Sequence, residues 1–253
     1  MRHFSQTKAA PMKRLACLLL SSWIAAPFAA SQSPTVYQSC LALAYQAPEQ
    51  ALQLADDPFS GLTEPESLHC QAEARLTGGD FRAAAQLFEQ VPLQMPLDAA
   101  EDQAFLWSQA AFAWEQAGDQ TRALVALDRL IASLPEYEGG YTYRAALLGR
   151  MNDYQTAIET LKLGLQIIPN SGLIQVFLAT AYRRDGQLER AAETLEAARL
   201  AGSTPPDLYI LEYGLIEVSR GNFQSAKEAF SLLIANHPQS DAAQSAARYL
   251  QQL

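Results

Sequence analysis

The chain has 253 residues, 49% of them hydrophobic, with 27 acidic and 18 basic side chains and a formal net charge of −9. This length and apolar content are enough for one or two domains with a core. The acidic balance argues against binding to the phosphate backbone of nucleic acids and against docking on anionic lipid.

The first 31 residues have the pattern of an export signal. Lys13 and Arg14 lead into an apolar run, residues 15–30, that ends in small side chains. A basic start followed by a short apolar stretch is typical of a secretory signal peptide. The run is short for a bilayer span and is interrupted by Pro27. We therefore predict that residues 1–31 are a signal peptide and that the mature chain is exported, periplasmic in a Gram-negative host or otherwise secreted.

The start and the cleavage site of this segment stay open. Both Met1 and Met12 can begin a signal peptide, and cleavage after Ser31, with Ala29 two residues before it, fits the small-x-small pattern best. Cys17 lies at the start of the apolar run and is poorly placed for lipid attachment, so we expect no stable membrane anchor after cleavage. The mature chain would keep 14 basic and 27 acidic groups, a net charge of −13.

Residues 32–63 are expected to form a short helix pair that caps the N-terminal end of the fold. Helical patterns cover residues 36–47 and 48–55, and Pro48 suits the first turn of a helix.

A two-residue turn recurs after this pair, each time just before a helical pattern. The copies are Gly79-Asp80, Gly118-Asp119, Asn152-Asp153, Gly186-Gln187 and Gly221-Asn222. The steps between them are 39, 34, 34 and 35 residues. A nearly constant period of this length indicates a stacked array of helical repeats.

The unit at residues 104–137 shows the pattern most clearly. Its first helix places four residues on one face: Trp107, Ala110, Ala111 and Trp114. Gly118 can end this helix in the left-handed conformation, and Asp119 can cap the next helix. In the second helix Ala123 occupies the position where a small residue lets the paired helix approach, and Pro135 ends the unit.

These positions resemble the tetratricopeptide repeat family, in particular its exported bacterial members, over residues 64–239. The resemblance implies an all-α fold, an α-solenoid of stacked helix-turn-helix repeats that forms a right-handed superhelix. It divides the chain into the capping pair, five repeats at 64–239 and a C-terminal capping helix at 240–253, with Ser240 as its N-cap.

After cleavage two cysteines remain, Cys40 in the capping pair and Cys70 in the first repeat. An even pair in an exported chain predicts a disulfide bond. Closing a loop of 29 residues would stabilise the fold by roughly 3–4 kcal/mol. The alternative is two buried free thiols, since cysteine is common in cores.

Catalytic and metal-binding patterns are not evident in the mature chain. Its two histidines are His69 and His237, and no nucleophile elbow, phosphate loop or paired-cysteine metal motif accompanies them. We expect His69 to be an ordinary surface histidine. The prediction is a protein that is not an enzyme and has no cofactor or metal.

The first helices of such repeats line a concave surface, which is the expected binding groove. Thr142, Ala146 and Gly149 would leave room there for a partner, and an arginine cluster stands beside that room. Because arginine pairs well with carboxylates, we expect a peptide with acidic side chains or a free C-terminus. The predicted partner-binding residues are Phe105, Phe112, Arg150, Arg183 and Arg184.

Two alternatives remain for these residues. The arginines lie near helix C-termini, where positive charge simply complements the helix dipole. The phenylalanines either line the groove or pack under a neighbouring element.

The sequence thus predicts a non-catalytic, exported scaffold or adaptor, in envelope complex assembly or polymer export, that binds a protein or peptide in its groove. The alternative is a structural protein that self-associates through an apolar stripe on the last repeat. That stripe consists of Leu208, Leu211, Leu215 and Val218. An enzyme of unrecognised type ranks last.

Overall fold

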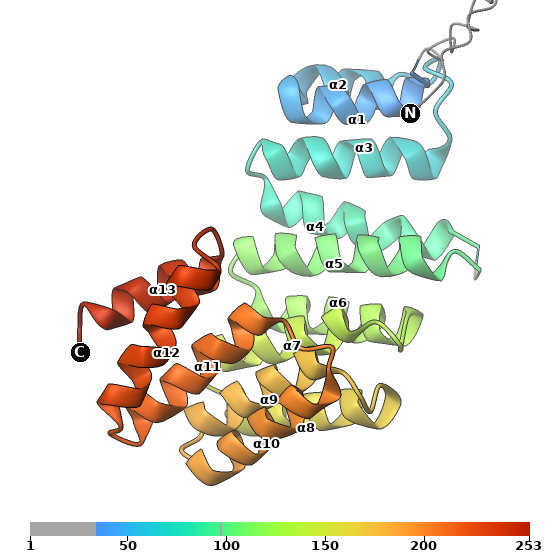
Figure 1. Cartoon of the computed structure of the whole chain (residues 1–253). Helices are drawn as coiled ribbons and strands as arrows, with labels where there is room; N and C mark the ends of the chain where they lie inside the picture. Colours follow the sequence, from blue (N-terminus) through green and yellow to red (C-terminus); the bar gives the residue numbers. More distant parts are fainter. Residues whose placement is uncertain (1–33, 97) are drawn as a thin grey trace, which may run out of the picture. The chain divides into compact units, whose positions relative to one another are not determined.

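The computed structural model describes residues 34–96 and 98–253, and the predicted signal peptide at 1–31 lies outside them. Over these residues the chain is helical without a strand (Figure 1). The helices are α1 (Val36–Gln46), α2 (Pro48–Asp56), α3 (Glu64–Thr77), α4 (Phe81–Gln90), η1 (Pro92–Gln94), α5 (Ala100–Gln116), α6 (Gln120–Ser133), α7 (Glu138–Arg150), α8 (Tyr154–Ile167), α9 (Gly172–Arg184), α10 (Leu188–Ala201), α11 (Pro206–Ser219), α12 (Phe223–Asn236) and α13 (Asp241–Leu250).

The α-helices pack in chain order, each one against the next along residues 34–253. Several odd-numbered helices also contact each other, namely α7 with α9, α9 with α11, and α11 with α13. This arrangement confirms the predicted all-α solenoid of helix pairs. The grouping of these helices into a capping pair, five repeats and a capping helix remains our proposal.

The recurring turns form as the sequence predicts. Gly118 adopts the left-handed conformation, with φ of +77°, and the Asp119 side chain accepts a hydrogen bond of 3.1 Å from the Arg122 amide. Asn152 takes the same conformation, with φ of 61°, and is the one residue other than glycine to do so among those described. Asparagine tolerates this region better than most residues, so the turn keeps its shape without glycine.

Small residues stand where paired helices come closest. Ala123, Ala157 and Ala191 are buried in the interfaces of their pairs. At Gly164 an added Cβ would lie 2.8 Å from Cγ of Tyr141, a distance that side-chain carbons do not tolerate. The approach of α7 and α8 therefore requires glycine there.

The N-terminal helices α1, α2 and α3 have a separate small core. It is built around Ala44, Ala51 and Ala74, with Cys40 and Cys70 fully buried among them. The two cysteines lie at disulfide distance, with Cα atoms 5.9 Å apart. Alanine buries little apolar area, so this core is weaker than one of large side chains and would gain most from a covalent link.

The apolar stripe of α11 is half-buried. Leu208, Leu211, Leu215 and Val218 pack against a cluster that includes Phe230 and, on α13, Ala242 and Ala246. The C-terminal helix thus covers part of the surface that self-association would use.

Replacing a buried interface alanine by leucine tests the repeat register. Ala123→Leu and Ala191→Leu should each lower the free energy of unfolding by roughly 1–3 kcal/mol, because neither site has room for a larger side chain. Urea denaturation measures the change. The exposed Glu136, in the loop after α6, provides the control, and Glu136→Ala should stay within about 0.5 kcal/mol. Tolerance of leucine at both alanines would contradict the register.

The cysteine pair is tested by thiol titration of residues 32–253 produced in an oxidising compartment. We expect no reaction with a thiol reagent in denaturant until a reductant is added. The double variant Cys40→Ala/Cys70→Ala should lose roughly 3–4 kcal/mol of unfolding free energy. Two reactive thiols in the unreduced, unfolded chain would show that the bond does not form.

Candidate interaction site

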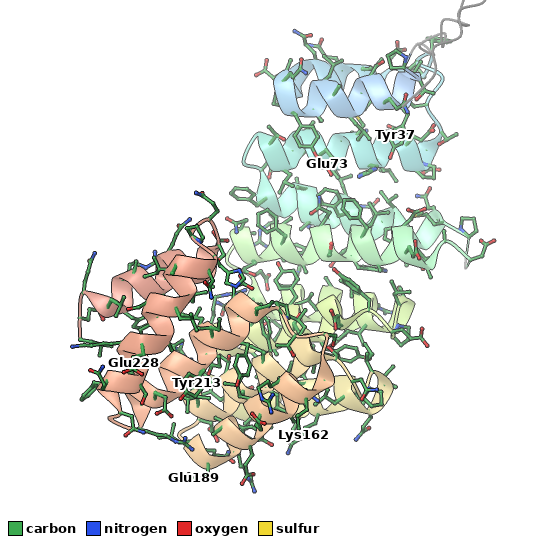
Figure 2. The ribbon with its side chains drawn as sticks, in the orientation of Figure 1. Tyr37, Glu73, Lys162, Glu189, Tyr213 and Glu228 are labelled. Carbon is green, nitrogen blue, oxygen red and sulfur yellow. A yellow bond between two sulfur atoms is a disulfide. The ribbon has the colours of Figure 1, made fainter. Side chains whose placement is uncertain are left out.

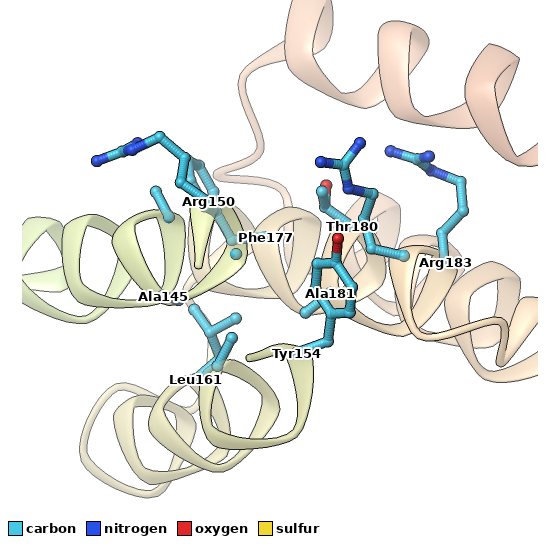
Figure 3. A pocket seen from close by; sticks show the side chains of 12 residues that line it. Ala145, Arg150, Tyr154, Leu161, Phe177, Thr180, Ala181 and Arg183 are labelled. Atoms are coloured by element: carbon cyan, nitrogen blue, oxygen red, sulfur yellow. The ribbon is translucent and has the colours of Figure 1, made fainter. Parts of the chain in front are cut away.

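A pocket opens between α7, α8 and α9, with a cavity volume of about 190 Å³ (Figure 3). Its lining residues are Ala145, Ala146, Gly149, Arg150, Tyr154, Ala157, Leu161, Phe177, Thr180, Ala181, Arg183 and Arg184. The pocket therefore has an apolar floor and an arginine-rich rim.

Small side chains create the cavity. Ala145, Ala157 and Ala181 are buried and leave space between larger neighbours. Leu161 closes the pocket from α8, and Phe177 contributes a half-buried ring from α9. At Gly149 an added Cβ would meet no atom within 4 Å, so this glycine borders open space and not a packed neighbour.

The three rim arginines differ in their partners. Arg150, the last residue of α7, donates to Glu115 of α5 at 2.7 Å. Arg183 donates twice to Glu212 of α11, at 2.6 and 3.1 Å, and this ion pair is largely buried. Arg184 is exposed and lies over the Tyr154 ring at 5.8 Å, and it forms no ion pair with a carboxylate of the described residues.

The structure thus brings the predicted Arg150, Arg183 and Arg184 together beside Ala146 and Gly149. Their role in partner binding stays a prediction. Two of them already pair with carboxylates of the chain, which the sequence interpretation missed because those partners lie 29 and 35 residues away. All three lie in the last turn of their helices, so the dipole explanation fits their positions equally well.

Thr142 does not leave room in the groove as predicted. Its side chain is buried, its hydroxyl donates to the Gly139 carbonyl at 3.2 Å, and it does not line the pocket. A threonine one turn from a helix N-terminus turns back to its own backbone, and this local hydrogen bond is its better option.

Phe105 and Phe112 lie on α5, away from the arginine pocket. They are 53% and 42% exposed, so the structure does not bury them under a neighbouring element. Phe105 lines a second cavity of about 350 Å³ together with Leu134 and Tyr137. The predicted binding residues therefore fall into separate places along the array.

A polar network near the N-terminus was not foreseen. His69 is not a surface histidine, because its side chain is only 14% exposed. Its Nδ1 shares a hydrogen bond of 2.5 Å with the Tyr37 hydroxyl, and its Nε2 lies 3.5 Å from Oε1 of Glu73. Tyr37 on α1 and Glu73 on α3 are labelled in Figure 2. The Glu73 carboxylate also accepts from Tyr45 at 3.0 Å and from Gln109 at 3.4 Å.

The network sets the charge state of Glu73. Burial raises the pKa of Glu73, but the neighbouring His69 imidazole and the hydrogen bond from Tyr45 outweigh burial, so the pKa lies below its ordinary value. Burial also raises the pKa of Tyr37, and the nearby carboxylates of Glu66 and Glu73 raise it further. The network joins α1, α3 and α5 through polar side-chain contacts. No set of three His, Cys, Asp or Glu side chains suited to a metal ion is found in the described part of the chain.

No helix within residues 34–96 and 98–253 has the length and apolar character of a membrane span. The helix pairs, packed in chain order, define a helical repeat protein of the solenoid class. Models of tetratricopeptide repeats match residues 150–212 and 210–240. Residues 150–240 therefore contain tetratricopeptide repeats.

Solved structures of the same fold are similar over most of the chain. TTC0263, a thermophilic tetratricopeptide repeat protein of Thermus thermophilus, is 18% identical with a TM-score of 0.53, and the match covers 75% of this chain and 100% of that one. MamA from Desulfovibrio magneticus RS-1, from residue 41 to its end, is 19% identical with a TM-score of 0.51, and the match covers 70% and 97%. At this level of identity the likeness supports the fold alone. No curated protein matches the chain.

The lowered pKa of Glu73 predicts a pH-dependent contribution to stability. A carboxylate whose pKa is lower in the folded than in the unfolded chain stabilises the fold above the unfolded pKa, and this contribution is lost as the pH falls through the folded pKa. The difference in unfolding free energy between wild type and Glu73→Gln should therefore shrink between about pH 5 and pH 3. Urea unfolding across this range measures it, with the exposed Glu136→Gln as control. A difference that stays constant would show that Glu73 is not ionised preferentially in the fold.

Proposed function

We propose that the protein is an exported, non-catalytic scaffold that binds a carboxylate-bearing segment of a partner protein at the arginine pocket. The observation that carries this proposal is the apolar cavity between α7, α8 and α9, with the exposed guanidinium of Arg184 at its rim. Tetratricopeptide repeats are protein-interaction modules, which supports a binding role over a catalytic one.

The chemistry of the rim favours a partner with acidic groups. Arginine offers a planar set of donors that matches a carboxylate, and its weak hydration lowers the cost of pairing at an interface. The chain as a whole is acidic, so this local positive rim differs in sign from most of the surface. A helix or an extended peptide with carboxylates is accordingly the ligand that fits best.

Export is the second part of the proposal and is supported by the basic and apolar pattern of residues 13–30 and by the cysteine pair at disulfide distance. Together with an acidic, repeat-built chain these features favour a role in the periplasm, in envelope complex assembly or polymer export. Self-association is the weaker alternative, because the α11 stripe that would carry it is half-covered by α13.

Reversing the charge of Arg184 tests the binding role. The mature wild-type chain and the Arg184→Glu variant are each crosslinked in envelope extracts. The variant should capture much less of the partner, because its new carboxylate repels the carboxylate of the ligand. Quantitative mass spectrometry should show at least a tenfold loss of the partner.

Arg129→Glu is the matched control, since Arg129 is exposed on α6 and does not line the pocket. Arg183→Glu is unsuitable, because it would place two buried carboxylates together at Glu212 and disturb the fold. Equal capture by wild type and Arg184→Glu would show that the partner does not bind at the arginine pocket. The absence of any specific partner would overturn the scaffold role.

A further inference from the structure

Side-chain links join consecutive odd-numbered helices, and those of α5–α7 and α9–α11 stand at equivalent repeat positions, whereas Glu73 of α3 lies one turn before the position equivalent to Glu115. Gln109 of α5 donates to Glu73 of α3 at 3.4 Å, and Tyr143 of α7 donates to Glu115 of α5 at 3.4 Å. Further along, Arg183 of α9 is paired with Glu212 of α11 at 2.6 Å.

At the corresponding position of the α7–α9 interface the described residues hold no side-chain link, and the polar contact between these helices lies at the other end, where Ser171, the N-cap of α9, donates to Glu138. Glu115, Gly149 and Arg183 are spaced 34 residues apart and occupy the same position of successive units. Gln109, Tyr143 and Phe177 form a second such series. Gly149 and Phe177 therefore stand where the α5–α7 and α9–α11 interfaces hold the pairs Glu115–Tyr143 and Arg183–Glu212, and neither side chain can make such a pair. The pocket is the space that the missing link leaves.

Packing does not explain the glycine. Gly149 is the penultimate residue of α7 and is not among the glycines with positive φ, so its conformation is one that alanine adopts more readily. An alanine Cβ would meet nothing within 4 Å, so no neighbour requires its absence. Glycine at this position keeps the pocket open at the expense of helix stability.

The size of the pocket limits what can enter it. A closed apolar cavity of about 150 Å³ holds one benzene molecule, and this pocket measures about 190 Å³. One leucine, methionine or phenylalanine side chain fits, and two do not. The charge at the rim adds a second requirement, because Arg184 offers a guanidinium without a carboxylate partner among the described residues.

We propose that Gly149 makes this pocket a receptacle for a single large apolar side chain of an acidic partner segment, with Arg184 pairing with a carboxylate beside that side chain. The inference rests on the proposed scaffold function and names the chemistry that the pocket recognises. Gly149 is the residue that determines specificity by size, and Arg184 is the residue that determines it by charge.

The test uses a small probe that carries both features, 4-methylpentanoate, titrated into the mature protein and followed by NMR. Resonances of Leu161 and Phe177 should shift with a saturable dependence on probe concentration. The neutral 4-methylpentan-1-ol, which lacks the charge, and propanoate, which lacks the branched chain, should each bind at least fivefold more weakly.

Variants separate the two contributions. Gly149→Leu fills the pocket and should weaken probe binding at least tenfold. Arg184→Gln should remove the preference for the carboxylate over the alcohol and leave binding of the alcohol unchanged. Arg129→Gln is the control and should bind like wild type. The unfolding midpoint of each variant checks the fold, and Gly149→Ala, which should unfold no earlier than wild type, provides a milder reduction if leucine disturbs α7.

Two results would overturn the inference: no saturable shift with wild type, or equal probe binding by wild type, Gly149→Leu and Gly149→Ala. Because the probe needs no partner protein, this failure is distinct from failure of the scaffold role. If Gly149→Leu still captured the partner and Arg184→Glu did not, the scaffold role would stand. The inference that the pocket receives an apolar side chain would then be wrong.

Discussion

The close approach of paired helices is the constraint on which the rest of the structure depends. Two helices of a pair can lie against each other only where alanine or glycine stands at the contact, as at Ala123, Ala191 and Gly164. Protein interiors are packed as densely as organic crystals, so one extra methyl group at these positions displaces a helix. These fixed contacts place residues that are 34 positions apart in the sequence at equivalent sites of successive units. The side-chain pairs between repeats, and the pocket where such a pair is missing, follow from this register.

Much of the fold was predictable because its signals are local. A turn of glycine or asparagine followed by an N-cap residue specifies a helix end and the next helix start within a few residues. Gly118 with Asp119 and Asn152 with Asp153 both do so. The spacing of Trp107, Ala110, Ala111 and Trp114 then gives the buried face. These features need no knowledge of distant partners, which is why the register could be derived from a single sequence.

The candidate site was only partly predictable, for the same reason. Sequence position indicated that the three arginines and Gly149 share a region, because the repeat places them on equivalent faces. Sequence position could not show that Arg183 pairs with Glu212 or that Arg150 pairs with Glu115, because such ion pairs depend on how one repeat is stacked on the next. The His69–Glu73 network was missed for a similar reason, as Tyr37, Tyr45 and Gln109 reach it from other helices.

The pairs between repeats also explain why one arginine is available and its neighbour is not. A buried ion pair contributes little net stability, but losing one partner leaves an isolated buried charge, which is strongly unfavourable. Arg183 is therefore committed to Glu212 and acts by fixing the position of α9 against α11. Arg184, one residue later, projects to solvent beside the same pocket. The helix thus assigns one guanidinium to the fold and leaves the next exposed, and in the proposed binding mode the pocket at Gly149 would accept the apolar side chain of a ligand whose carboxylate pairs with Arg184.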